Sequence, residues 1–138
     1  MNYPRFALAA LGGTVAYFAA GFLAFGLIPT LRQEYARFPA IYRTQEGVKS
    51  VMPLGMAGML GGIAILTLLY ARMTRSGSGL ADGAWFGAMI GLFAVCAFAL
   101  HNYVNLRIGL KLTAEQAIAY FVEWTVVGIV IGAIYRTG

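Results

Sequence analysis

Four long apolar segments dominate this sequence and limit the folds open to it. They run from Phe6 to Pro29, Ser50 to Ala71, Gly83 to Leu106 and Ala114 to Tyr135. About 20 apolar residues in a helix cross the ~30 Å hydrocarbon core of a bilayer. Because 60% of the residues are hydrophobic and only 11% are charged, a soluble globule would lack polar surface. We therefore predict an all-α integral membrane four-helix bundle that forms a single membrane domain over residues 1–138.

The first apolar segment follows Arg5 and so resembles the start of a signal peptide. It is too long for that role, and no A-x-A cleavage site follows it. We expect a retained membrane anchor. The single cysteine, Cys96, lies in the third segment, so no intramolecular disulfide and no CxxC redox pair is expected.

The positions of the basic residues indicate an orientation in the membrane. Ten Lys and Arg against five Asp and Glu give a net charge of +5. The basic residues lie at or beyond the ends of the segments, so the charge requires no nucleic-acid partner. The first and third connectors hold six of them: Arg32, Arg37, Arg43, Lys49, Arg107 and Lys111. The termini and the second connector hold four: Arg5, Arg72, Arg75 and Arg136. The excess favours both termini outside the cytoplasm.

The connectors and helix starts give local expectations. Short connectors join the second segment to the third and the third to the fourth, which predicts antiparallel hairpins. Thr113 with Gln116 three residues later matches a capping box, and Asp82 suits the start of the third helix.

The longest connector places four apolar or aromatic residues at helical spacing: Leu31, Tyr35, Phe38 and Tyr42. This pattern fits an interfacial amphipathic helix that Pro39 interrupts. It fits equally a continuation of the first helix beyond the membrane. Both alternatives stay open at the level of sequence.

Glycines at four-residue spacing mark the second and third segments. Gly58 and Gly62 form one pair, and Gly83, Gly87 and Gly91 form a longer row. Helices in lipid associate through close backbone contact, which such ridges of small residues permit. We expect the second and third helices to touch closely. The ridges either seal the bundle, which we favour, or contact a second copy or another subunit.

The fourth segment carries an acid, Glu123, near the middle of the membrane, with Gln116 and Tyr120 on the same stripe of the helix. An acid there costs ~2.5 kcal/mol or more, so it is expected to face the bundle interior, a cavity or a partner. Because no Lys or Arg lies inside a segment, we expect Glu123 to be protonated and hydrogen-bonded to Tyr120, Thr125 or a neighbouring helix. It is either a structural acid or a proton, ion or substrate site.

Three polar residues, His101, Asn102 and Asn105, lie near the end of the third segment. His101 and Asn105 are one turn apart and are candidates to hydrogen-bond Gln116 or Tyr120 across the hairpin. A lone histidine can ligate haem, but a six-coordinate haem needs a second ligand and the sequence has no other histidine. We therefore expect no cofactor and no metal site.

The stretches HNYVNLRIGLKLT and FVEWTVVG resemble a family of small four-span bacterial inner-membrane proteins of unknown function. That family has roughly Y-D-L-T-N-L, and later an acid close before a tryptophan. Asn105 and Leu106 match the N-L pair and Trp124 the tryptophan, whereas Asn102 replaces the first acid and Glu123 lies directly beside Trp124. The resemblance implies a multi-pass bundle in the bacterial cytoplasmic membrane, and it implies no activity.

No sequence motif supports catalysis. The sequence has no Gly-rich phosphate loop, no HExxH, no GxSxG and no pair of acids arranged for acid–base work. We expect a non-catalytic helical bundle, an accessory or self-associating membrane component whose partners are the lipid bilayer and further copies or other membrane subunits. The alternative is a small transporter, channel or lipophilic-ligand-binding protein that uses Glu123.

Overall fold

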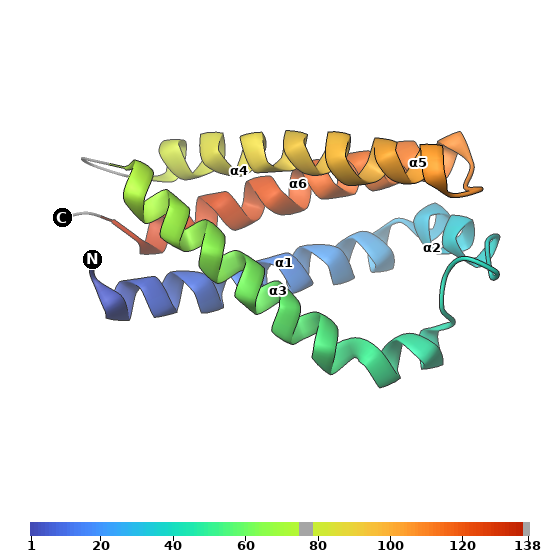
Figure 1. The fold of residues 1–138 in the computed structure, drawn as a ribbon, viewed down its shortest axis with the longest axis horizontal. Helices are drawn as coiled ribbons and strands as arrows, with labels where there is room; N and C mark the ends of the chain where they lie inside the picture. The colour runs from blue at the N-terminus through green and yellow to red at the C-terminus, as the bar shows by residue number, and fades with distance from the viewer. Residues whose placement is uncertain (75–78, 137–138) are drawn as a thin grey trace.

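The computed structural model describes residues 1–74 and 79–136, and these residues form helices and no strand. Four helices are long and apolar enough to cross a membrane: α1 (Tyr3–Leu27), α3 (Gln45–Met73), a rod over Leu80–Asn105, and α6 (Leu110–Ile134) (Figure 1). The predicted all-α four-helix architecture is confirmed. By length and hydropathy the chain is a multi-pass membrane protein.

The third rod consists of three joined pieces. They are α4 (Leu80–Ala94), a π-helical turn η1 (Val95–Leu100) and α5 (His101–Asn105). Each long helix begins three to five residues before the apolar segment that predicted it, at positions 3, 45, 80 and 110 rather than 6, 50, 83 and 114. Hydropathy marks the apolar part of a helix, whereas its first turn also includes polar residues.

Side-chain caps begin two of the long helices. The side chain of Asn2 accepts a hydrogen bond from the backbone of Arg5, and Thr44 caps α3 in the same way. The other two helices begin after Gly79 and Gly109 without a side-chain cap.

The expected caps at Asp82 and Thr113 are therefore wrong. Both residues lie inside the first turn of their helices. There Asp82 places a negative charge at the positive end of the helix dipole. The Thr113 hydroxyl donates to the Gly109 carbonyl at 3.1 Å, which satisfies it within its own helix.

Helix α6 lies at the centre of the packing. The rod over Leu80–Asn105, which we call the α4 rod, runs along α6 (Figure 1). Helix α1 also packs against α6, and α3 packs on α1. The buried cluster that joins these helices consists of Ala9, Ile63, Tyr70, Phe86, Val127, Ile131 and Tyr135. The start of α1, the end of α3, the start of α4 and the end of α6 lie at one end of the bundle, which we call the terminal end, and α2 lies at the other.

Glycines bring α4 and α6 into backbone contact. A Cβ at Gly83 would lie 2.4 Å from the Gly128 carbonyl oxygen, and one at Gly87 would lie 2.4 Å from that of Trp124. A Cβ at Gly91 would lie 3.0 Å from Phe121. The glycine row of the third segment therefore packs against the fourth helix.

The expected contact between the two predicted glycine ridges is wrong. A Cβ at Gly58 or Gly62 would meet no atom within 4 Å. The α3 helix reaches α4 near their connection, where the rings of Tyr70 and Phe86 lie 5.3 Å apart. The row on α4 is instead occupied by α6, whose own glycines Gly128 and Gly132 are also four residues apart.

Helix α3 crosses α1 and then diverges from the bundle. At the crossing, a Cβ on Gly13 would lie 3.0 Å from Ile63. The buried residues of α3 are Ile63, Thr67 and Tyr70, all in its second half. Toward its N-terminus the helix leaves the other helices, as the green ribbon in Figure 1 shows.

The long connector forms a separate short helix, α2 (Pro29–Ala36). The backbone breaks at Ile28, with φ −114° and ψ 86°, so α2 is not a continuation of α1. Leu31 is buried with Ile108 and Leu112 at the start of α6. The apolar face of α2 is therefore held by protein contacts, which dock the connector onto α6.

Candidate functional site

The acid in the fourth helix lies between α6 and α1. Glu123 is 8% exposed, and its Oε1 lies 3.4 Å from the position that a Cβ on Gly21 would occupy. A methyl group at position 21 would lie at ordinary van der Waals distance from the carboxyl group, and a larger side chain would crowd it. Gly21 thus leaves room on α1 for the Glu123 side chain.

The Glu123 carboxyl group has no hydrogen-bond or ion-pair partner within residues 1–74 and 79–136. The expected bond to Thr125 is wrong, because the Thr125 hydroxyl donates to the Phe121 carbonyl at 2.7 Å. The expected bond to Tyr120 is also wrong. The Glu123 oxygens keep a small accessible surface, unlike Gln116 Oε1, which is fully buried without a partner among the described residues. A polar group held largely out of water without a partner costs free energy and usually has a functional or structural explanation.

Three tyrosines surround the carboxyl group at longer range. Tyr17, Tyr35 and Tyr120 all interact electrostatically with Glu123. Tyr17 is fixed by its ring contact with Trp124, whose centroid lies 5.2 Å away. Because the tyrosines come from α1, α2 and α6, this set depends on the tertiary fold, and Tyr17, Tyr35 and Gly21 were absent from the sequence-based site.

Gln116 continues this polar region toward α2. It is 2% exposed, and its Nε2 donates to the hydroxyl oxygens of Tyr35 at 2.9 Å and Tyr42 at 3.1 Å. The Tyr35 and Tyr42 rings are 4.6 Å apart. Burial raises the pKa of the Tyr35 hydroxyl above its ordinary value, which favours a neutral phenol. We call Tyr17, Tyr35, Tyr42, Gln116, Tyr120 and Glu123 the polar track.

The expected partners of Gln116 on the third helix are wrong. His101 and Asn105 are exposed, and the Asn105 side chain donates to the His101 carbonyl at 3.0 Å. Asn102 is half-buried and makes no side-chain hydrogen bond to the polar track among the described residues. The partners of Gln116 are Tyr35 and Tyr42 of the long connector, and not residues of the third helix.

An ion-pair cluster closes the α2 end. Glu34 is 5% exposed, and its Oε1 lies 3.0 Å from Arg37 and 3.2 Å from Lys111 of α6. The pair with Lys111 joins the connector to the start of α6. Within the described part of the chain, no group of three His, Cys, Asp or Glu side chains has the geometry of a metal site.

Replacing Gln116 with leucine should loosen α2. The Gln116→Leu variant loses both tyrosine bonds and leaves the partly buried hydroxyls of Tyr35 and Tyr42 without that donor, which costs about 1–3 kcal/mol. Hydrogen exchange should become faster in residues 29–42 than in the long helices. Asn105→Ala, which removes an exposed local bond, is the control and should leave exchange in the connector unchanged; equal protection in both variants would contradict docking through Gln116.

A second candidate surface lies on α3 between Leu54 and Gly62. A Cβ at Gly55, Gly58, Gly61 or Gly62 would meet no atom within 4 Å. Large apolar side chains beside these glycines are also uncovered, including Leu54, which is 77% exposed. We call this surface the α3 glycine face.

Comparison with known proteins adds no further information. No family model, no curated protein and no solved structure matches this chain. The resemblance carried by Asn105, Leu106 and Trp124 stays a prediction.

Proposed function

We propose that the chain is a non-catalytic, self-associating component of a bacterial cytoplasmic membrane, and that it acts through helix–helix contacts of the α3 glycine face. The observation that carries the proposal is the uncovered row of glycines on α3. The resemblance to small four-span inner-membrane proteins supports the location.

The same chain shows what such a row does when it is occupied. Gly83 and Gly87 on α4 admit the backbone of α6 to direct contact. Gly58 and Gly62 have the same spacing, but a Cβ at either would meet no atom of the described residues within 4 Å. A groove of glycines allows the backbone of a facing helix to approach closely and make extensive van der Waals contact, whereas flexible lipid tails do not pack against it as closely.

Local stability gives a second reason for a partner at α3. Pro53 lies inside the helix and removes a backbone hydrogen-bond donor. Glycine in a helix interior costs about 1 kcal/mol relative to alanine. A helical stretch that contains Pro53 and four glycines therefore benefits from packing against another helix.

A second copy of the chain fits this surface. Two copies with the same orientation in the membrane can place their α3 helices side by side around a two-fold axis. Glu46 and Lys49 are exposed at the start of α3, so each copy offers an acid and a base to the other. These opposite charges favour a parallel, symmetric contact.

The test is the oligomeric state in mild detergent. Wild type should be dimeric or larger by native mass measurement. The Gly58→Leu/Gly62→Leu variant should dissociate at a protein concentration about tenfold or more higher than wild type does, because each added side chain separates the helices. Gly26→Leu is the matched control, because a Cβ at that α1 glycine also meets no atom within 4 Å. A strictly monomeric wild type with no co-purifying partner would overturn the proposal.

A second candidate function is a proton, ion or solute path along the polar track. The observation that favours it is the buried Glu123 carboxyl without a bond among the described residues, because ionisable groups inside membranes commonly mark such paths. Flux into liposomes should be lost in Glu123→Gln and retained in Asp82→Asn, an exposed acid outside the track. Absence of flux for protons and a panel of ions and solutes would remove this candidate.

A further inference from the structure

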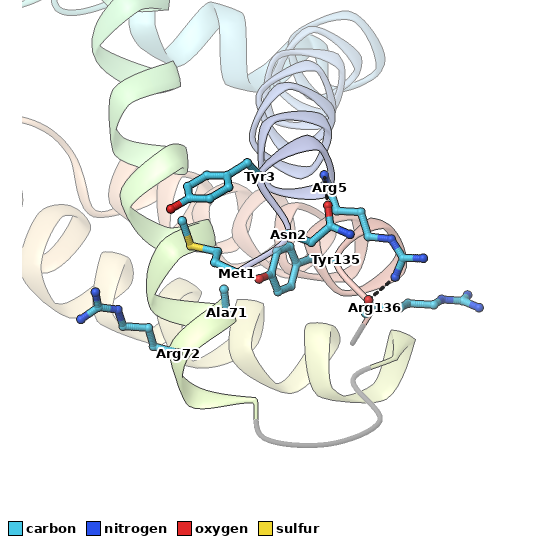
Figure 2. Close-up of a pocket in the computed structure, with 8 residues that line it drawn as sticks. All are labelled: Met1, Asn2, Tyr3, Arg5, Ala71, Arg72, Tyr135 and Arg136. Atoms are coloured by element: carbon cyan, nitrogen blue, oxygen red, sulfur yellow. Dashed lines mark hydrogen bonds between the residues drawn. The ribbon is translucent and has the colours of Figure 1, made fainter. Parts of the chain in front are cut away.

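A pocket of about 600 Å³ opens at the terminal end of the bundle, between the start of α1, the end of α3 and the end of α6. Arg5, Arg72 and Arg136 are among the residues that line it. Figure 2 shows Arg5 and Arg136 on one edge of the pocket and Arg72 on the opposite edge, beyond Ala71, with the side chains of Arg72 and Arg136 extending outward from the rim. Three elements that are distant in sequence thus contribute one arginine each.

The charge of this pocket is not balanced by acids. None of the described residues that line it is acidic. Of the five acids in the sequence, Asp82 lies at this end, and it lines a different pocket with Tyr70 and Trp85. The pocket therefore presents a positive field to the aqueous side.

The arginines of the pocket also have N–H groups that are available to donate hydrogen bonds to a ligand. A guanidinium carries five N–H donors, and in the described hydrogen bonds Arg5 uses one, toward the backbone carbonyl of Arg136 (Figure 2). This bond holds the Arg5 guanidinium at the rim and ties the start of α1 to the end of α6. The remaining donors suit phosphate oxygens, which arginine binds in a forked geometry.

The position of the pocket suits a group attached to the membrane surface. It lies where three apolar helices end, and the exposed Tyr3 beside it is a residue typical of the membrane–water interface. A single phosphate fits one guanidinium fork, whereas a pocket with arginines on two edges fits a larger headgroup. Polar side chains of Asn2 and Tyr3 line the space between those edges.

We propose that the pocket formed by Arg5, Arg72 and Arg136 binds the phosphate-bearing headgroup of an anionic lipid. The site is separate from the α3 glycine face and from the polar track. Its ligand chemistry is a phosphate group, which either a lipid or free phosphate supplies. The experiment separates these two sources.

The test measures lipid retained by the full chain in detergent, by native mass spectrometry, with phosphatidylglycerol, phosphatidylcholine and inorganic phosphate as probes. One variant is Arg5→Gln/Arg72→Gln/Arg136→Gln. The control is Arg32→Gln/Arg43→Gln/Arg107→Gln, which removes the same charge from exposed arginines at the opposite end. Circular dichroism verifies helix content in both.

Phosphatidylglycerol affinity should fall roughly tenfold to a hundredfold in the pocket variant, because a basic residue close to an anionic headgroup contributes about fivefold to binding. It should stay within about twofold in the control, because the control arginines do not line the pocket. Phosphatidylcholine should bind weakly to all three proteins. If the pocket variant loses helix content, a variant with lysine in place of the three pocket arginines takes its place in the test. It keeps the charge and should bind phosphatidylglycerol more tightly than the glutamine variant and less tightly than wild type.

Two results would overturn the lipid assignment. Inorganic phosphate that displaces phosphatidylglycerol at millimolar concentration would make the pocket a phosphate site. Equal losses in the pocket variant and the control would show that lipid binding follows net charge. No loss in either would show that lipid binding depends neither on these charges nor on this pocket.

Discussion

Gly128→Ala should destabilise the bundle by about 1–3 kcal/mol, the usual cost of overpacking, with the upper end expected. A Cβ at Gly128 would lie 2.3 Å from the Gly83 carbonyl oxygen and 2.5 Å from the Gly87 Cα. These are backbone atoms, so no side-chain rotation relieves the overlap. The α4 rod and α6 must separate along the most extensive helix contact of the fold.

The control is the same substitution on α3. A Cβ at Gly58 meets no atom within 4 Å, so Gly58→Ala should leave the stability of a single bundle unchanged or raise it by up to about 1 kcal/mol through helix propensity. Unfolding by SDS titration, followed by circular dichroism, measures both variants at a protein concentration where the oligomeric state is known. Equal destabilisation by the two substitutions would contradict the α4–α6 contact.

The sequence predicts the helices more reliably than their neighbours. Hydropathy and length identify each long helix, because a membrane-spanning helix satisfies its own backbone groups. Glycine spacing shows that a helix packs closely but does not name the partner. Gly128 and Gly132 repeat the spacing of Gly83 and Gly87, and this match is the signal that pairs the third helix with the fourth rather than with the second.

The candidate site was predictable in part. An acid in an apolar helix has to avoid lipid, and Glu123 does lie against α1. Its surroundings were not predictable, because Tyr17 and Gly21 belong to a helix about a hundred residues earlier and Tyr35 to the connector. The break at Ile28 turns α2 back onto α6, and helical spacing within the connector carries no information about that turn.

Glu123→Leu should stabilise the folded bundle by about 1–3 kcal/mol, because the wild-type carboxyl is buried without a hydrogen bond among the described residues and leucine removes that cost. A hydrogen bond to Tyr120 or Thr125, as expected from the sequence, would instead make this substitution destabilising. Glu123→Gln keeps a buried polar group of similar size, so its stability should stay close to that of wild type.

The comparison with Gln116 makes this prediction specific. Gln116→Leu places the same side chain on the same helix, seven residues earlier, but it removes two described hydrogen bonds and should therefore destabilise. SDS titration of Glu123→Leu, Glu123→Gln and Gln116→Leu should give stabilities in that descending order. If Glu123→Leu is instead less stable than Glu123→Gln, a bonded ligand or water holds the carboxyl group, and Glu123 is then a structural residue. If the predicted order holds, the chain retains an acid that weakens its own fold, which is the pattern expected of a residue kept for function.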